Sequence, residues 1–151
     1  MLLDAFNNDE IPSDDPYLIA TFHYYDPFSF TKTTYTNPSY DPAWGTTEEL
    51  AQVATDFDAV VSANNSWATR NLTEPLPIYL GEFGVDNEAD NHGSDRKKWL
   101  SWIRMQAEAR GMSWAHWNMY QNQPATKGMG AWTSGSNGTI QNPSTRDFDP
   151  D

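Results

Sequence analysis

The chain has 151 residues, a length that suits one domain with a sizeable hydrophobic core. Its 21 acidic against 9 basic residues give a formal net charge of -12, which argues against nucleic acid or an anionic membrane as a partner and fits a neutral or cationic ligand. The sequence has no cysteine, which excludes disulfides and thiolate chemistry, and no apolar run approaches the roughly 20 residues of a membrane span.

Aromatic residues are unusually frequent, with seven each of Trp, Tyr and Phe. A core of this size needs fewer tryptophans, so we expect some rings to face a ligand. The flat apolar face of such a ring stacks on the C–H face of a sugar, while its polar edge remains free to form hydrogen bonds.

The first predicted strand covers residues 17–23, a run of β-branched and aromatic residues that follows Pro16. Residues 1–16 are expected to be an acidic N-terminal lead-in. The polar and aromatic loop 24–45 that follows the strand is longer than usual connections, which favours a functional loop.

Two helices are predicted. Thr46 and Glu49 form a capping box, and apolar residues then recur at helical spacing until the polar residues 64–66, where we expect this helix to end. A second helix begins at Ser94 or Asp95 and ends at Gly111, which stands in the C′ position. The expected core positions of the two helices are Leu50, Val53, Ala54, Phe57, Val60, Val61, Trp99, Trp102, Ile103 and Ala107.

Two further strands are predicted at residues 78–83 and 113–119. The first of them delivers a glutamate, Glu82, near its end, between two glycines. Strand, loop, helix and strand then alternate, which implies parallel neighbours whose following loops share one edge of the sheet. The side chains that meet at this edge are His23, Tyr25, Glu82 and Trp117, and they predict a functional site there.

Three segments carry a family resemblance: residues 21–31 (TFHYYDPFSFT), 78–84 (IYLGEFG) and 114–118 (WAHWN). They resemble the ends of the sixth, seventh and eighth strands of the (β/α)8 barrel in glycoside hydrolase family 5, the cellulase family of clan A. The resemblance implies an α/β fold, a partial (half) TIM-type barrel with three to four parallel strands and two main helices. The barrel part would cover residues 17–133, followed by an irregular tail over 134–151.

By this resemblance, Glu82 is the nucleophile of a retaining endo-β-1,4-glucanase, and His23 and Tyr25 line the subsite and orient the carboxylate. Trp117 is the platform beneath the sugar. Further substrate contacts are expected from Tyr24, Trp44, Asn118 and Trp132. The alternatives are a non-catalytic glucan-binding module, which keeps the aromatic rim without the acid, and a β-mannanase of the same family.

The chain departs from the family pattern in its second carboxylate. The family's acid/base glutamate lies in an Asn-Glu-Pro motif after the fourth strand, and this sequence begins beyond that point. Glu88, in the loop after the second strand, is the expected internal replacement, with Asp26 and Asp86 as rivals. Glu74 lies in Thr-Glu-Pro but precedes its strand, which places it at the opposite end. Lys32 replaces the histidine that follows Phe-Thr in the family.

No metal or cofactor is expected. The three histidines, His23, His92 and His116, lie in separate segments without the spacing of a metal site. The first four residues lack the basic and apolar regions of a signal peptide, while the resemblance implies a secreted protein.

A sheet of three parallel strands with helices on it has two open edges and needs cover on both faces. We therefore expect the chain to pair with itself, or with another chain, to complete a barrel-like core. The sequons at Asn64, Asn71 and Asn137 predict that these asparagines are exposed.

Overall fold

The computed structural model describes residues 2–32, 41–85 and 94–117. Its strands form one parallel sheet in the order β1-β2-β3, as the sequence predicted. Their bounds are Ala20–Tyr24 for β1, Ile78–Phe83 for β2 and Ser113–Trp114 for β3. Strand β1 begins later than predicted, because Tyr17 and Ile19 remain exposed and pair with no neighbour in the described sheet.

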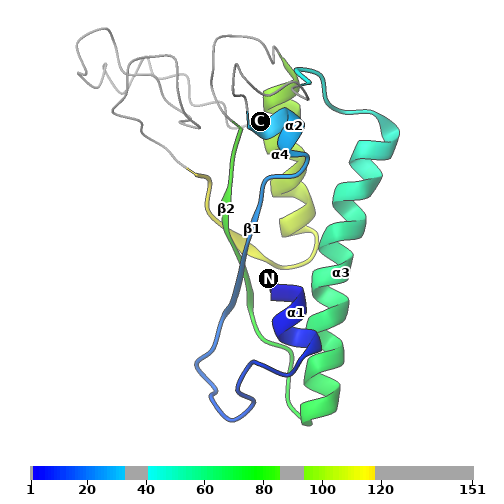
Figure 1. The fold of residues 1–151 in the computed structure, drawn as a ribbon. Helices are drawn as coiled ribbons and strands as arrows, with labels where there is room; N and C mark the ends of the chain where they lie inside the picture. The colour runs from blue at the N-terminus through cyan, green and yellow to red at the C-terminus, as the bar shows by residue number, and fades with distance from the viewer. Residues whose placement is uncertain (1, 33–40, 86–93, 118–151) are drawn as a thin grey trace, which may run out of the picture.

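Four helices accompany the sheet in the described residues: α1 Leu2–Asn7, α2 Phe28–Thr31, α3 Thr47–Asn71 and α4 Ser94–Glu108. The long helices α3 and α4 lie on the same side of the strands, and α1 lies beside the lower half of α3 (Figure 1). No described helix combines the length and apolar character that a bilayer crossing requires. The order of elements gives two consecutive β-α-β units, the pattern of a parallel β/α barrel.

A bulge interrupts the pairing of β1 with β2. Phe22 is opposite Leu80, but the next residue, His23, is opposite Glu82, so Gly81 is an extra residue in β2. Successive side chains of a strand point to opposite faces, and an extra residue reverses the alternation beyond it. The bulge therefore brings Glu82 to the same face of the sheet as His23.

Gly81 is required at this bulge. A Cβ atom there would lie 2.8 Å from Thr21 Oγ1, a distance at which one of the two atoms must shift. The same Cβ would lie 3.4 Å from His23 Nε2. Because the alternation reverses at this glycine, Leu80 and Phe83 both face the helices, where they are 0% and 2% exposed. The same chain segment thus supplies core residues to one face and a carboxylate to the other.

The core fills the space between the strands and helices α3 and α4. The apolar periodicity predicted for both helices is confirmed, since Val53, Phe57, Trp99 and Ile103 are at most 1% exposed. Helix α3 begins at the predicted capping box: Glu49 N–H donates to Thr46 Oγ1 at 3.2 Å, and Thr46 N–H donates to Glu49 Oε2 at 2.9 Å. Helix α4 ends as predicted, with Gly111 at a φ of 68°.

The predicted end of α3 at residues 64–66 is wrong, because the helix continues to Asn71. Asn64 is buried, and its side-chain amide donates to Leu76 O at 2.9 Å while its Oδ1 accepts from Leu76 N at 3.1 Å. This pairing satisfies a polar group that otherwise favours leaving the helix. It also contradicts the exposure predicted from the sequon at Asn64, whereas Asn137 lies outside the described residues.

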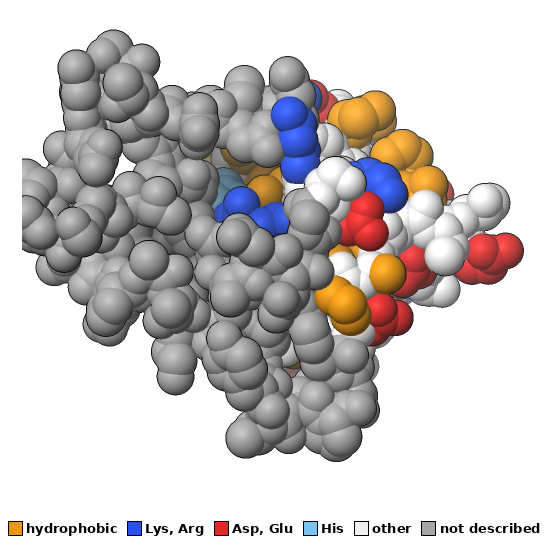
Figure 2. Space-filling model, turned by 90° about the horizontal axis from the view of Figure 1, so that it is seen from above, with side chains coloured by type: hydrophobic (Ala, Val, Ile, Leu, Met, Phe, Trp, Pro, Cys, Tyr) orange, Lys and Arg blue, Asp and Glu red, His pale blue; other side chains and the backbone are white. Residues whose placement is uncertain are grey.

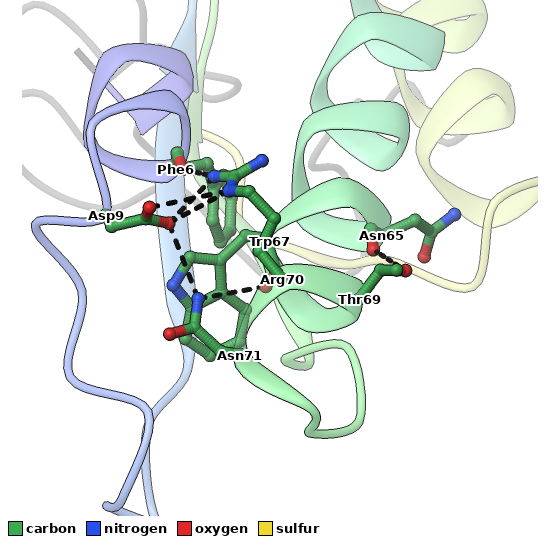
Figure 3. Close-up of polar contacts among 7 residues, drawn as sticks. All are labelled: Phe6, Asp9, Asn65, Trp67, Thr69, Arg70 and Asn71. Carbon is green, nitrogen blue, oxygen red and sulfur yellow. Dashed lines mark hydrogen bonds and ion pairs between the residues drawn. The ribbon is translucent and has the colours of Figure 1, made fainter.

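Part of the expected lead-in forms the helix α1, which packs against α3. Phe6 is 0% exposed and its ring lies 5.9 Å from that of Trp67. Arg70 donates to Phe6 O at 2.6 Å and to Asp9 Oδ1 at 2.8 Å, and Asn71 donates to the same Asp9 oxygen, as Figure 3 shows. The hydrogen bond from Arg70 lowers the pKa of Asp9. The segment is therefore fixed mainly by burial of Phe6, since exposed ion pairs contribute little.

Strand β3 is shorter than the predicted 113–119, but its continuation still follows β2. Ala115 N–H donates to Leu80 O and Trp117 N–H donates to Phe83 O, both at 2.9 Å. Residues 118 and 119 lie outside the described part of the chain.

Candidate active site

Three of the predicted residues meet at the carboxyl end of the sheet. The Tyr25 hydroxyl donates to Glu82 Oε2 at 2.8 Å. His23 Nδ1 lies 3.3 Å from the same oxygen. His23 and Glu82 are register partners on neighbouring strands, and Tyr25 follows directly after β1. A hydroxyl group and an imidazole nitrogen from one segment therefore converge on one carboxylate oxygen from the next.

The Glu82 carboxylate is restrained but accessible. Its side chain is 26% exposed and that of His23 is 51% exposed. Within the described residues both contacts fall on Oε2, so the second oxygen, Oε1, carries no hydrogen bond. Figure 2 looks down on this end of the molecule, where acidic, basic and apolar side chains of described residues lie close together. A carboxylate that is contacted at one oxygen and accepts no hydrogen bond at the other is suited to nucleophilic attack.

The loop that carries Tyr25 is held by residues that sequence reasoning missed. Thr31 Oγ1 donates to the backbone oxygen of Tyr25 and closes the turn through α2. Trp99 Nε1 donates to the backbone oxygen of Asp26 at 3.2 Å and ties the same loop to α4. The first bond is local to the loop and the second joins distant segments, and the sequence carried no periodic or motif signal for either. They fix the position of the Tyr25 hydroxyl relative to β2.

Trp117 lies beside the end of β2 through its backbone bond to Phe83, and its side chain is 48% exposed. The structure therefore places an accessible indole on the segment where a sugar platform was expected. Glu88, Asn118 and Trp132, the other expected members of the site, lie outside the described residues.

Tyr24 and Trp44 do not lie where a substrate contact requires. Both are buried in the core, with 7% and 3% of their surface exposed. The Tyr24 hydroxyl donates to Asp56 Oδ2 of α3 at 2.6 Å, and burial together with this bond raises the pKa of Tyr24. Alternation along β1 explains the difference, because Tyr24 must face opposite to His23. We therefore remove both residues from the candidate site.

Asp26 and Glu74, two further acidic residues near the strands, both lie in the described part of the chain. Burial, and then the negative charge of Asp56, raises the pKa of Asp26. Glu74 is exposed and precedes β2, so it lies at the other end of that strand from Glu82, as expected.

His116 differs from His23 in its surroundings. Its ring packs edge-on against Phe83, and its Nε2 atom is buried without a hydrogen-bond partner among the described residues. Burial, with a smaller contribution from the charge of Arg96, lowers the pKa of His116 to about 4. In the described part of the chain, no three His, Asp or Glu side chains gather in a way that would hold a metal ion.

The comparisons with known sequences agree on one family. A model that describes cellulases of glycosyl hydrolase family 5 matches residues 3–123. Endoglucanase H of Acetivibrio thermocellus is 41% identical over 111 residues, which are 74% of this chain and 11% of that protein. Endoglucanase B of Clostridium cellulovorans is 25% identical over 117 residues, 78% of this chain and 24% of that protein. The chain thus spans a quarter or less of the length of these curated relatives.

Solved structures give the same fold. Thermotoga maritima Cel5A in complex with cellobiose matches with a TM-score of 0.65 and 27% identity, covering 87% of this chain and 40% of that chain. The cellulose synthase subunit Z from Clostridioides difficile matches with a TM-score of 0.62 and 32% identity, covering 86% and 40%. A complex of Thermotoga maritima Cel5A with mannotriose matches with a TM-score of 0.60 and 28% identity, covering 81% of this chain and 36% of that chain. The predicted partial barrel is confirmed.

Proposed function

Because the chain belongs to glycosyl hydrolase family 5, we propose that it acts in the hydrolysis of β-1,4-glucosidic bonds, with Glu82 as the nucleophile of a retaining mechanism. The observation that supports this role is the convergence of Tyr25 and His23 on a single oxygen of Glu82. A carboxylate that was only a solvated surface group would not need two positioned donors. The endoglucanase names of the relatives supply the substrate class.

In the proposed reaction, Glu82 Oε1 bonds to the anomeric carbon while the glycosidic C–O bond breaks. A second carboxylic acid protonates the departing oxygen, and its conjugate base then removes a proton from the water that releases the sugar from Glu82. Tyr25 and the N–H at His23 Nδ1 hold Oε2 throughout, so the carboxylate does not rotate away from the reacting carbon. Both donors also stabilise Glu82 as a leaving carboxylate in the second step.

The second carboxyl group must lie about 5–5.5 Å from the first in a retaining enzyme. We propose Glu88 as the candidate within this chain, because it follows β2 on the loop that leaves the same edge of the sheet. Trp117 is proposed as the sugar platform, and Asn118 and Trp132 as further contacts to the glucan.

An activated substrate tests Glu82 independently of that acid. The dinitrophenolate of 2,4-dinitrophenyl β-cellobioside departs without protonation, so its release reports on nucleophilic attack alone. We expect Glu82→Gln to reduce this release at least about 10³-fold, the scale of losing a nucleophile. Glu74→Gln, which neutralises an exposed carboxylate at the other end of β2, is the matched control. Equal release by wild type and Glu82→Gln would remove Glu82 from the mechanism.

Two other functions share this site. A non-catalytic glucan-binding module would retain affinity for cellulose in both wild type and Glu82→Gln and release no reducing ends from either. A β-mannanase is favoured by one observation, that a structural relative at 28% identity is a complex with mannotriose. Reducing-end assays on carboxymethylcellulose, mannan and xylan distinguish these functions.

We propose in addition that a second copy of the chain covers the open sheet. The chain covers 40% of a solved relative, so two copies supply most of the elements of one barrel. Each copy carries a formal charge of -12, so association should strengthen as salt screens the repulsion. Light scattering that shows a folded monomer at micromolar concentration in both low and high salt would exclude this pairing.

A polymeric glucan also places the proposed activity outside the cell.

A further inference from the structure

Lys32 lies against the tyrosine that holds Glu82. It directly follows helix α2, and its Nζ atom is 4.9 Å from the centroid of the Tyr25 ring. The hydroxyl at the other end of that ring donates to Glu82 Oε2 at 2.8 Å. An ammonium group, a phenol and a carboxylate are therefore connected in series.

The local backbone fixes this arrangement. Lys32 N–H donates to Phe28 O at 3.1 Å, which closes the turn of α2. Thr31 Oγ1 donates to the backbone oxygen of Tyr25. Thr31, the residue before Lys32, is therefore hydrogen-bonded to Tyr25, whose ring the Lys32 ammonium group approaches. The Phe28 ring also contacts that of Tyr25, with centroids 6.4 Å apart. The lysine side chain thus starts from a position that the turn determines, and it is partly buried.

The residue type matters at this position. A lysine ammonium is charged throughout the neutral pH range, whereas a histidine is charged only below its ordinary pKa. A cation within about 6 Å of an aromatic face is attracted to the ring, more strongly where water is excluded. The same charge draws electron density from the phenol and makes its O–H a better hydrogen-bond donor, because donors strengthen as their electron density falls.

We infer that Lys32 is a positioning residue for the reaction of Glu82, acting through the ring and hydroxyl of Tyr25. The inference rests on the proposed role of Glu82. Lys32 restrains the Tyr25 ring from its face, and Tyr25 in turn holds Glu82 Oε2 in place. Lys32 itself forms no bond with the reacting atoms in this scheme, so its loss affects the chemical step and leaves the glucan contacts intact.

The kinetic test compares Lys32→Met, which keeps the length of the side chain but not its charge, with Lys32→Arg, which keeps the charge. For dinitrophenyl cellobioside we expect Lys32→Met to lower kcat about 3- to 30-fold with little change in KM, the scale of one cation–π contact. Lys32→Arg should stay within about threefold of wild type. Lys97→Met, on the exposed part of α4, makes the same change in net charge and should leave both constants unchanged. Equal kcat for Lys32→Met and wild type would overturn the inference.

A second readout does not depend on turnover. The ¹³Cζ resonance of tyrosine reports on the hydrogen bond of its hydroxyl, and Tyr25→Phe identifies the signal of Tyr25. We expect Lys32→Met to shift this signal and Lys32→Arg to leave it near its wild-type position. An unmoved signal in Lys32→Met, or equal shifts in the two variants, would overturn the inference. Glu82→Gln decides the proposed function separately, since it tests turnover without touching Lys32.

Discussion

The two faces of the sheet are built from the same strands and differ in what their side chains contact. On the covered face, Leu80 and Phe83 pack against α3 and α4 and exclude water. On the open face, the side chains of His23 and Glu82 remain partly exposed and lie in contact, with His23 Nδ1 3.3 Å from Glu82 Oε2. Strand alternation places the neighbours Glu82 and Phe83 on opposite faces, and the bulge at Gly81 places Glu82 on the face opposite to Leu80. Substitutions on the covered face should act on folding, and those on the open face on chemistry.

The adjacent residues Phe83 and Glu82 give the largest contrast. Phe83→Ala removes a ring that is 2% exposed and contacts Trp99, so we expect a loss of about 3–5 kcal/mol in the free energy of unfolding. Glu82→Gln should change that free energy by less than about 1 kcal/mol, because the contact between Glu82 and His23 is partly exposed. Urea unfolding followed by circular dichroism measures both. Comparable losses in the two variants would contradict the division between the faces.

His116, whose ring packs against Phe83, tests the covered face through pH. The pKa of His116 is lowered to about 4 from an ordinary value of 6.5, so the unfolded chain binds the proton more readily than the folded chain. The stability that its neutral form supplies is complete above about pH 6.5 and disappears as the pH falls through about 4, amounting to about 3 kcal/mol at most.

His116→Phe should therefore flatten the pH dependence of stability between pH 6.5 and 4. Urea midpoints at a series of pH values would show this. A profile for His116→Phe that is as steep as wild type would mean that His116 does not titrate in this window.

The bulge itself can be tested with one methyl group. Gly81→Ala places a Cβ atom 2.8 Å from Thr21 Oγ1, and we expect a cost of about 1–3 kcal/mol together with lower turnover. Removing the hydroxyl with Thr21→Ala should recover much of both losses in the double variant, while Thr21→Ala alone has little effect. Full additivity of the two substitutions in thermal unfolding would show that the clash is not at Thr21.

The smallest expected effect lies away from both faces, at the end of α3. Leu72 has a φ of 53° and is 95% exposed, so its side chain gains no burial in a left-handed conformation that glycine adopts without strain. Leu72→Gly should raise the free energy of unfolding by about 0.5–1 kcal/mol. A lower melting temperature in this variant would show that Leu72 makes a stabilising contact.

The sequence predicted those parts of the fold that depend on local signals. The capping box at Thr46, the C′ glycine Gly111 and the apolar periodicity of α3 and α4 are all confirmed. Local chemistry determines each of them, since a cap requires one hydroxyl and one carboxylate at fixed spacing. The convergence of His23, Tyr25 and Glu82 followed from the order of the elements.

The parts that were missed depend on contacts between distant residues. Asn64 continues a helix because Leu76, twelve positions later, satisfies its amide. Composition could not show that the Trp44 ring is buried, because an aromatic residue suits both a core and a sugar platform. Tyr24 was predictable, since simple alternation along β1 separates it from His23. The bulge at Gly81 was not, because the glycine alone does not reveal which strand pairs with it.

The pairing of Asn64 with Leu76 has a consequence for producing the protein. Asn64-Asn65-Ser66 is an acceptor sequence for N-linked oligosaccharides, which eukaryotic secretory hosts attach while the chain is still being translocated. An Asn64 amide that carries an N-linked oligosaccharide cannot enter the buried position beside Leu76. Modification at Asn64 would therefore prevent closure of the segment that leads into β2, whereas a bacterial cytoplasm leaves this amide free to fold.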